Sequence, residues 1–262
     1  MVLKITDSCD MGCSHCLSDC KPTNNFMSWE TLKIVDAFIS IIDPLCLIIS
    51  GGEPLMHPEF EAILNYIYGE FSCLAITIAT NGEWLLAHKD DAIRMYEQYP
   101  HVMWQISNDS RFYPRKIDLK NDLWKNRDRY ILTINDDCVQ KVYPLGRAEK
   151  NGLGEEFKCS QCFNIRSATY QMGDFQKAVK ALEARGKFCT PSITWDGYLD
   201  LGESNLCKPL GKVEYYMSTF FDKNTTSMFS EITKDTINFT CKKCQWINEK
   251  LPALHKTTIN FE

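Results

Sequence analysis

Three cysteines lie close together near the N-terminus. The stretch CDMGCSHC at residues 9–16 contains Cys9, Cys13 and Cys16, so their spacing is C-x3-C-x2-C. Zinc sites usually take pairs of ligands from two separate turns, whereas three thiolates from one loop suit a cubane iron–sulfur cluster with one iron free of protein ligands. That open iron can bind a small molecule, so the spacing predicts a reactive site. Cys20 falls outside the spacing, and we expect a free thiol there rather than a fourth ligand.

Glycine-rich or polar segments follow three predicted strands further along the chain. LCLIIS at residues 45–50 runs into GGEP, CLAITIAT at 73–80 runs into NG, and HVMWQIS at 101–107 runs into ND. The C-terminal ends of parallel strands lie at one edge of a sheet, where open and barrel α/β folds bind their ligands. The two glycines would let the backbone approach an ammonium group closely, and Glu53 would add a carboxylate. We therefore expect these segments to meet at one site.

The first half of the chain alternates between strand and helix patterns. Ser28 is placed to N-cap a helix whose apolar residues share one face, and Pro58 stands at the first position of the next predicted helix. This alternation predicts an α/β fold with a parallel sheet and crossover helices, open or partly closed as a barrel. The predicted strands are 2–6, 45–50, 73–80, 101–107 and 129–135, and the predicted helices are 28–42, 57–70, 84–97 and 116–126.

The composition is that of a soluble globular protein. Hydrophobic residues make up 44% of the 262 residues and charged residues 24%, and no stretch approaches the ~18 apolar residues of a membrane span. The N-terminus MVLKITDSCD lacks the apolar core of a signal peptide, so we expect a cytoplasmic protein without a membrane partner. In a reducing compartment, 13 cysteines favour metal binding over disulfides.

The charge balance argues against a nucleic-acid partner. The net charge of −5 gives no general affinity for a polyanion. The segment 111–129 is a local exception, with seven Lys or Arg and three Asp. We favour a solvated helical face for this segment over a patch that binds an anionic substrate. A third candidate function, modification of nucleic acid, would depend on this segment.

The pattern changes after residue 146, and a second group of cysteines follows. PLGRAEKNGLGEEF at residues 144–157 reads as a loop, and SITWDGYLDLG at 192–202 has apolar runs on both sides of Asp196-Gly197, a strong hairpin signal. We place a domain boundary near residue 150, with 1–150 as the core and 151–262 as a small unit organised by metal. The six later cysteines are Cys159, Cys162, Cys189, Cys207, Cys241 and Cys244.

The first half resembles the radical S-adenosylmethionine (radical SAM) superfamily, which carries this cysteine spacing in the loop after its first strand. The resemblance implies a partial (β/α)6 TIM-type barrel, a [4Fe–4S] cluster held by the three cysteines, and SAM bound at the open iron. It also implies that SGGEP meets the amino end of SAM and that His15 takes the place of a ring residue. The SAM-binding residues expected from the resemblance are His15, Gly51, Gly52, Glu53, Thr80, Asn81 and Ser107.

The second half resembles the shortened auxiliary-cluster module, called twitch, of radical SAM enzymes related to the SPASM group. The match is close to the 2-deoxy-scyllo-inosamine dehydrogenase branch, and PLGRA resembles a segment of SPASM-type enzymes. It implies a second [4Fe–4S] cluster, whose ligands would be Cys189, Cys207, Cys241 and Cys244. Cys159 and Cys162 depart from the pattern; they could replace one pair, bind another metal or be free thiols. A zinc ribbon built from two CxxC pairs is the structural alternative.

The resemblance implies oxidative radical chemistry. A reduced cluster would split SAM into methionine and a 5′-deoxyadenosyl radical, which removes a hydrogen atom from the substrate, and the auxiliary cluster would accept an electron. An external donor such as flavodoxin or ferredoxin would reduce the first cluster. A non-catalytic zinc-binding protein is the alternative from another class.

The substrate is left between two classes. Most SPASM-like relatives modify peptide or protein side chains, as in the maturation of peptide natural products, which makes this class the first expectation. The first strand begins almost at residue 1, which leaves no room for a leader-peptide-binding domain and favours a small polar metabolite such as an aminosugar or aminocyclitol.

Four further residues have open or structural readings. Arg147 would bind a substrate carboxylate or serve a structural role. Cys46 and Cys73 lie in apolar strands and are expected to be buried small hydrophobic residues, and Cys138 is a buried thiol or part of the pocket.

Overall fold

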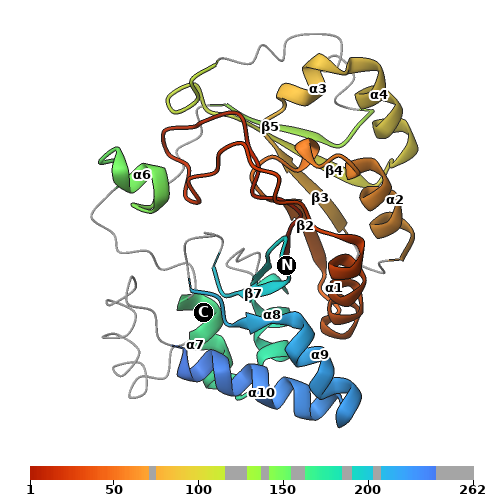
Figure 1. Ribbon diagram of the computed structural model, residues 1–262, viewed down its shortest axis with the longest axis vertical. Coiled ribbons are helices and arrows are strands. Elements are labelled where there is room, and N and C mark those ends of the chain that lie inside the picture. The colour runs from red at the N-terminus through yellow and green to blue at the C-terminus, as the bar shows by residue number, and fades with distance from the viewer. Residues whose placement is uncertain are drawn as a thin grey trace.

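The computed structural model describes residues 1–70, 75–115, 129–136, 142–154, 163–184, 191–202 and 208–239. Its strands form one sheet with helices beside it (Figure 1). In chain order the elements are β1 (Val2–Lys4), α1 (Trp29–Ile42), β2 (Cys46–Ser50), η1 (Pro54–Met56), α2 (Phe60–Glu70), β3 (Ala75–Thr80), α3 (Glu83–Ala87), α4 (Lys89–Gln98), β4 (Val102–Asn108), β5 (Leu132–Asp136), α6 (Gly146–Lys150), α7 (Phe163–Met172), α8 (Phe175–Ala184), β6 (Ser192–Ile193), β7 (Tyr198–Asp200), β8 (Gly211–Lys212), α9 (Val213–Asp222) and α10 (Thr225–Asn238).

The sheet is mixed and open. Its strand order is β5-β4-β3-β2-β1-β6-β7-β8, and every pair from β5 to β6 is parallel. The last two pairs are antiparallel. Within the described residues β5 and β8 form the two edges, so the sheet does not close on itself. The predicted α/β class is therefore confirmed, with the sixth parallel strand beside β1 rather than beside β5.

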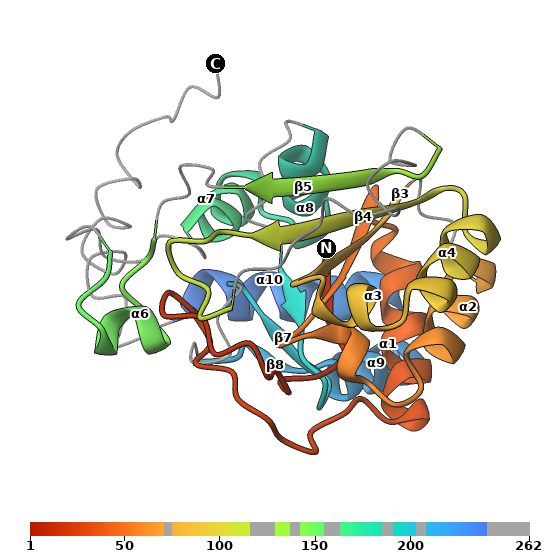
Figure 2. The same cartoon turned by 90° about the horizontal axis from the view of Figure 1, so that it is seen from above.

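The two faces of the parallel strands differ in chemistry. Side chains alternate along a strand, so each strand contributes to both faces. One face is apolar: Trp104 of β4 packs against Phe60 of α2 and Tyr96 of α4, with ring centroids 6.4 and 5.0 Å apart. Figure 2 shows α1, α2 and α4 gathered on one side of the sheet. The buried apolar residues of the strands include Leu3, Leu47, Ile49, Ile76, Ile78, Trp104 and Ile106.

Local capping sets where the helices begin and end. The Ser28 hydroxyl accepts a hydrogen bond from the Thr31 N–H at 3.2 Å, which confirms the predicted N-cap of α1. The prediction for Pro58 is wrong, because α2 begins at Phe60. A turn precedes this helix, in which the His57 ring accepts the N–H of Glu59 at 3.0 Å.

The helix predicted over residues 84–97 is divided into two. At the end of α3 the His88 N–H donates to the Trp84 carbonyl at 2.9 Å. At the start of α4 the His88 carbonyl accepts the Ala92 N–H at 2.9 Å. The ring of His88 stacks on that of Trp84 with centroids 4.4 Å apart. The helix predicted over 116–126 lies outside the described residues.

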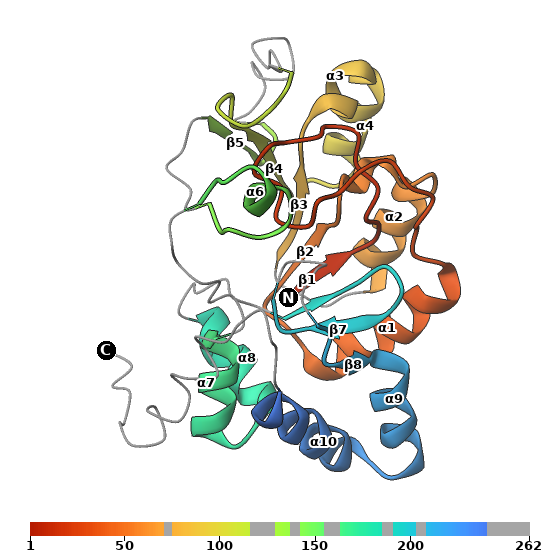
Figure 3. The ribbon, with the colours of Figure 1, turned by 60° about the vertical axis from the view of Figure 1, so that its left-hand side comes forward.

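The predicted Asp196-Gly197 hairpin is confirmed and extends the sheet. Gly197 has φ +80° and donates to the Thr194 carbonyl at 2.9 Å, which makes the turn between β6 and β7. Since β6 pairs with β1, residues from both sides of position 150 share one sheet. Figure 3 shows α9 and α10 beyond β7 and β8, and α9 packs against α1.

The expected division of the chain at residue 150 stays a prediction. In the described part of the chain, no helix combines the length and apolar character needed to span a bilayer.

Candidate functional site

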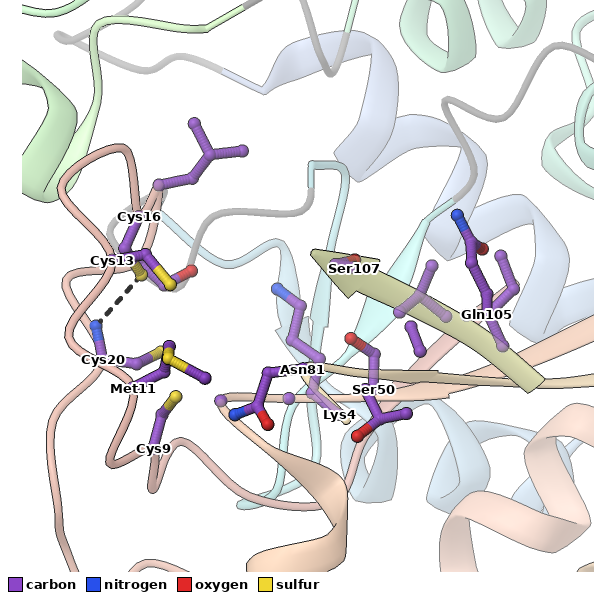
Figure 4. Close-up of a pocket in the computed structure, with 18 of the residues that line it drawn as sticks. Lys4, Cys9, Met11, Cys13, Cys16, Cys20, Ser50, Asn81, Gln105 and Ser107 are labelled. Atoms are coloured by element: carbon purple, nitrogen blue, oxygen red, sulfur yellow. Dashed lines mark hydrogen bonds between the residues drawn. The ribbon is translucent and has the colours of Figure 1, made fainter. Parts of the chain in front are cut away.

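A cavity of about 640 Å³ lies where the cysteine loop (residues 5–28, between β1 and α1) meets the parallel strands. Figure 4 shows the cysteine side chains at one end of this cavity, with side chains from the strands along the rest of it. Of the sequence-predicted residues, those with a described place in its wall are Cys9, Cys13, His15, Cys16, Gly51, Gly52, Thr80, Asn81 and Ser107. The structure thus brings together segments that the sequence places far apart.

The three cysteines of the C-x3-C-x2-C spacing face the same cavity (Figure 4). Burial raises the pKa of Cys9 to about 11 and that of Cys13 to about 12. The pKa of Cys16 is lowered to about 6, chiefly because the Cys20 thiol donates a hydrogen bond to its sulfur. The backbone N–H of Cys20 also approaches that sulfur, at 3.4 Å. Metal binding deprotonates a coordinated thiol, so a cationic cluster would offset the cost of ionising the two buried thiols.

The donor set fits a cubane better than a single metal ion. Among the residues that the structure describes, no three His, Cys, Asp or Glu side chains surround a single metal-ion position. A [4Fe–4S] cube presents a different iron to each thiolate, so the three sulfurs must face one volume rather than converge on one point. Three thiols on the wall of one cavity meet that requirement.

Arg147 of α6 fastens the cysteine loop. Its guanidinium donates to the Cys13 carbonyl at 3.0 Å, to the Cys20 carbonyl, and to the Asp19 carboxylate at 2.9 Å. Its backbone N–H donates to the Cys16 carbonyl at 2.9 Å. Figure 3 shows α6 next to the cysteine loop. These contacts assign Arg147 a structural role, one of the two readings that the sequence left open.

Gly51 and Gly52 let the start of the cysteine loop dock on β2. A Cβ on Gly51 would lie 2.2 Å from the Thr6 carbonyl oxygen, and one on Gly52 would lie 2.2 Å from that of Ser8. The Gly52 N–H donates to the Thr6 carbonyl at 2.9 Å, and the Glu53 N–H donates to the Ser8 carbonyl at 2.7 Å. The glycines are therefore required by backbone packing, whatever ligand they contact on the cavity side.

Glu53, which follows β2, binds residues at the end of β3. Its carboxylate, only 2% exposed, accepts from the Thr80 hydroxyl and the Asn81 N–H, both at 2.7 Å, and from the Leu55 N–H at 3.2 Å. Burial raises the pKa of Glu53 to about 7, against the opposing effect of these donors. Its role in this structure is to hold two strand ends together, and direct contact with SAM stays a prediction.

Two buried polar atoms in the cavity wall have no hydrogen-bond partner among the described residues. They are His15 Nδ1 and Asn81 Nδ2. The His15 ring is fixed by stacking on Phe112, with centroids 4.6 Å apart, and burial lowers the pKa of His15. Buried polar groups are normally satisfied, so the two atoms fit a site that a polar cofactor such as SAM completes.

Several cavity residues escaped the sequence analysis. Lys4 and Gln105 point into the cavity from β1 and β4, and Tyr113 also lines it. The sequence signal for Lys4 was a lysine within the apolar run VLKIT. Because every second residue of a strand faces the same side, its face of the sheet could have been inferred. Cys46 also lines the cavity and is only half-buried, so its prediction as a buried hydrophobic residue is wrong. Cys20 is buried at the same wall.

Other predicted residues lie outside the described part of the chain. They include the proposed auxiliary ligands Cys189, Cys207, Cys241 and Cys244, together with Cys73, Cys138, Cys159 and Cys162. Most of the basic segment 111–129 also lies outside it. Of its described residues, Arg111 pairs with Asp109, and Arg115 pairs with Glu83 at 2.6 Å.

Comparisons with known proteins give relatives for part of the chain. No family model matches the chain. It is 30% identical over 89 residues to an S-adenosylmethionine-dependent nucleotide dehydratase of Selenomonas ruminantium, which covers 33% of this chain and 31% of the relative. It is 34% identical over 85 residues to an AdoMet-dependent heme synthase of Methanosarcina barkeri, covering 31% of this chain and 24% of the relative. These partial matches support the resemblance to the radical SAM superfamily over about a third of the chain.

The fold is similar to that of a solved structure. A crystal structure of BtrN in complex with AdoMet and 2-DOIA matches with a TM-score of 0.52 at 12% identity, covering 92% of this chain and 91% of that chain. At that identity the likeness shows the fold alone. The sequence matches span less than a third of the length of the two curated relatives.

Gly52→Ala tests the docking of the cysteine loop. The new methyl group would meet the backbone at Ser8 and Asp7, so we expect roughly 1–3 kcal/mol of destabilisation and a reduced iron and sulfide content after anaerobic reconstitution. Gly69→Ala in α2 is the matched control, because nothing lies within 4 Å of its Cβ position. Normal cluster loading in Gly52→Ala would contradict the packing argument.

Arg147→Lys tests the fastening of the loop by α6. Lysine keeps the charge but lacks the planar fork that reaches two carbonyls and a carboxylate together. We expect a loss of about 1.5–3 kcal/mol in chemical denaturation and lower iron retention on dilution. Lys150→Ala, at an exposed partner of the same Asp19, should have little effect. A variant with full iron retention but weaker SAM binding would assign Arg147 to the ligand instead.

Proposed function

We propose that this chain is a radical SAM oxidoreductase, which holds a [4Fe–4S] cluster on Cys9, Cys13 and Cys16 and binds SAM beside it. Such a reduced cluster supplies the electron that splits SAM into methionine and a 5′-deoxyadenosyl radical, which takes a hydrogen atom from the substrate. The observation that supports this proposal most strongly is the cavity itself. Its wall contains three thiols of one loop and polar residues at the ends of β2, β3 and β4.

The residues around the cavity would orient SAM and exclude water. Asn81 Nδ2 and His15 Nδ1 are buried and offer hydrogen bonds to the polar end of SAM. Ser107 lies further along the cavity wall on β4, where its hydroxyl can serve the ligand. Glu53 fixes Thr80 and the Asn81 backbone, so it positions the strand end that carries Asn81. Restricting water access protects a reactive radical from side reactions.

We also propose that a second [4Fe–4S] cluster, bound by Cys189, Cys207, Cys241 and Cys244, accepts one electron from the substrate radical. The resemblance of this spacing to the twitch module supports this part of the proposal. A zinc ribbon built from the two CxxC pairs, Cys159/Cys162 and Cys241/Cys244, is the competing interpretation. An external flavodoxin- or ferredoxin-like donor would supply the electron that starts each turnover.

Two lines of reasoning favour two different substrate classes. A peptide or protein side chain remains the first candidate, on the prior set by SPASM-like enzymes. A small polar metabolite is favoured by a specific observation: about 640 Å³ lies within the range of pockets that hold one drug-sized ligand, roughly 300–1,000 Å³, so little room is left beside SAM. The polar residues of the strands along that cavity also suit a hydroxylated or charged compound.

Single cysteine variants test the cluster assignment. Cys9→Ala, Cys13→Ala and Cys16→Ala should each lose most of the SAM-dependent release of 5′-deoxyadenosine under dithionite, because an iron would lose its thiolate. Cys46→Ala is the control, since this thiol lines the same cavity but lies outside the spacing. The wild-type protein should contain about eight irons, or about four if the auxiliary cluster is wrong. Zinc in place of iron would contradict the proposal.

Deuterium transfer distinguishes the substrate classes. Candidate peptides and small polyols labelled at carbon should pass deuterium to 5′-deoxyadenosine only when the labelled C–H bond is the one that reacts. Transfer from a peptide residue would establish the first candidate, and transfer from a small metabolite would establish the second.

A further inference from the structure

We infer that Gln105 determines substrate specificity: its side-chain amide binds an uncharged hydroxyl or amide group of the substrate, together with the hydroxyl of Ser50. This inference rests on the proposed function, because it assigns the substrate part of the same cavity. Gln105 lies on β4, lines the cavity and is half-buried. In Figure 4 its side chain lies far from the cysteine side chains, with Ser50 between them.

The cavity face of the sheet is arranged in rows that cross the parallel strands. Side chains alternate along a strand, so every second residue of β1 to β4 faces the cavity. By the register of strand pairing, one row consists of Lys4, Ser50, Ala79 and Gln105. The next row, toward the N-terminal ends of the strands, consists of Val2, Ile48, Thr77 and Met103. The row of Gln105 is therefore polar, and the next row is mostly apolar.

The Gln105 amide and the Ser50 hydroxyl have no hydrogen-bond partner in the described part of the chain. A side-chain amide has two donor hydrogens and a carbonyl acceptor, and a hydroxyl both donates and accepts. Apolar side chains can fill such strand positions, as Ile48 and Met103 do in the next row. Since polar groups in a protein interior are normally hydrogen-bonded, these two are available to a ligand that both donates and accepts.

The charges around this part of the cavity favour an uncharged ligand group. Lys4 already interacts within the fold, where the Asp200 carboxylate attracts its charge. The other residues of the two rows are neutral. A charged group on the substrate would lose its hydration there without meeting a free opposite charge, whereas a hydroxyl or amide needs only hydrogen bonds. The two rows therefore fit a neutral polar group with a hydrocarbon part beside it.

The ribose of SAM carries two neighbouring hydroxyls, which makes SAM the main competitor for Gln105. Asn81 and Ser107 line the cavity nearer the cysteines, where the polar end of SAM must lie to reach the open iron (Figure 4). Ser107 is two residues beyond Gln105 on β4, so at ~3.3 Å per residue Gln105 lies roughly 7 Å further from that end. This places Gln105 on the substrate side, and SAM binding must be measured separately.

Two matched pairs of probes test the inference on the anaerobically reconstituted, SAM-loaded protein. Cyclohexanecarboxamide and cyclohexanecarboxylate share a shape and differ in charge, and cyclohexane-1,2-diol and cyclohexanol differ by one hydroxyl. Ligand-observed NMR would measure each affinity. The wild type should prefer the amide over the carboxylate, or the diol over cyclohexanol, by on the order of three- to ten-fold, as one added hydrogen bond would give. The two pairs distinguish a site for an amide from a site for hydroxyls.

Gln105→Met keeps the length of the side chain but removes its hydrogen bonds, so it should abolish the preference, and Gln105→Asn should retain part of it. Gln98→Met is the control, since Gln98 is exposed on α4. The inference is overturned if the wild type shows no preference in either pair, or if Gln105→Met keeps the preference. It is also overturned if Gln105→Met weakens SAM binding by a comparable factor. Ser50→Ala should weaken the same preference, and a full preference in this variant would contradict the inference even if Gln105→Met fails to fold.

The two proposals can fail separately. Release of 5′-deoxyadenosine by the wild type tests the proposed function and does not depend on the probes. Absence of this product together with a Gln105-dependent preference would remove the radical SAM activity and leave a site for a neutral polar ligand. Product release without such a preference would do the reverse.

Discussion

The site depends on one close backbone contact, between the chain that follows β1 and the two glycines that follow β2. The Thr6 and Ser8 carbonyls accept hydrogen bonds from Gly52 and Glu53, at distances that leave no room for a side chain at positions 51 and 52. This contact delivers the cysteine loop to the edge of the parallel strands. Without it the three thiols would have no fixed position relative to β3 and β4, and a common cavity could not form.

Two further sets of interactions turn this contact into a rigid site. Glu53 ties the ends of β2 and β3 through its buried carboxylate, and Arg147 ties the far side of the cysteine loop to α6 through two backbone carbonyls and Asp19. Both side chains bind backbone groups that would otherwise lack partners in a loop. Their charge-assisted bonds offset the conformational entropy lost in ordering so much irregular chain. The cysteine loop is thus held at its start by the residues that follow β2 and in its middle by Arg147.

Local signals predicted much of this structure, and long-range contacts account for what they missed. The Ser28 cap, the apolar strands and the Asp196-Gly197 turn depend on neighbours in sequence, so pattern was sufficient to find them. The pairing of β6 with β1 and the bonds of Arg147 join residues more than 100 positions apart, and no local pattern encodes them. The helix start predicted at Pro58 was wrong because a turn precedes α2, which begins at Phe60. In this turn the His57 ring accepts the Glu59 N–H.

The residues of the cavity also divide into those that the sequence predicted and those that it missed. The cysteine spacing and the motifs at the strand ends predicted residues that do line the cavity. They could be predicted because the C-terminal ends of parallel strands always lie at the same edge of the sheet. Lys4 and Gln105 were missed, although their alternation along strands gave a usable signal. The bonds of Glu53 to Thr80 and Asn81 were not foreseen, and its expected contact with a ligand stays a prediction.

Electron paramagnetic resonance of the reduced, anaerobically reconstituted protein tests the central claim most directly. If the N-terminal thiols leave one iron open, adding SAM should change the spectrum of the reduced cluster in the wild type, because SAM becomes a ligand of that iron. A reduced cluster whose spectrum is the same with and without SAM would contradict the account.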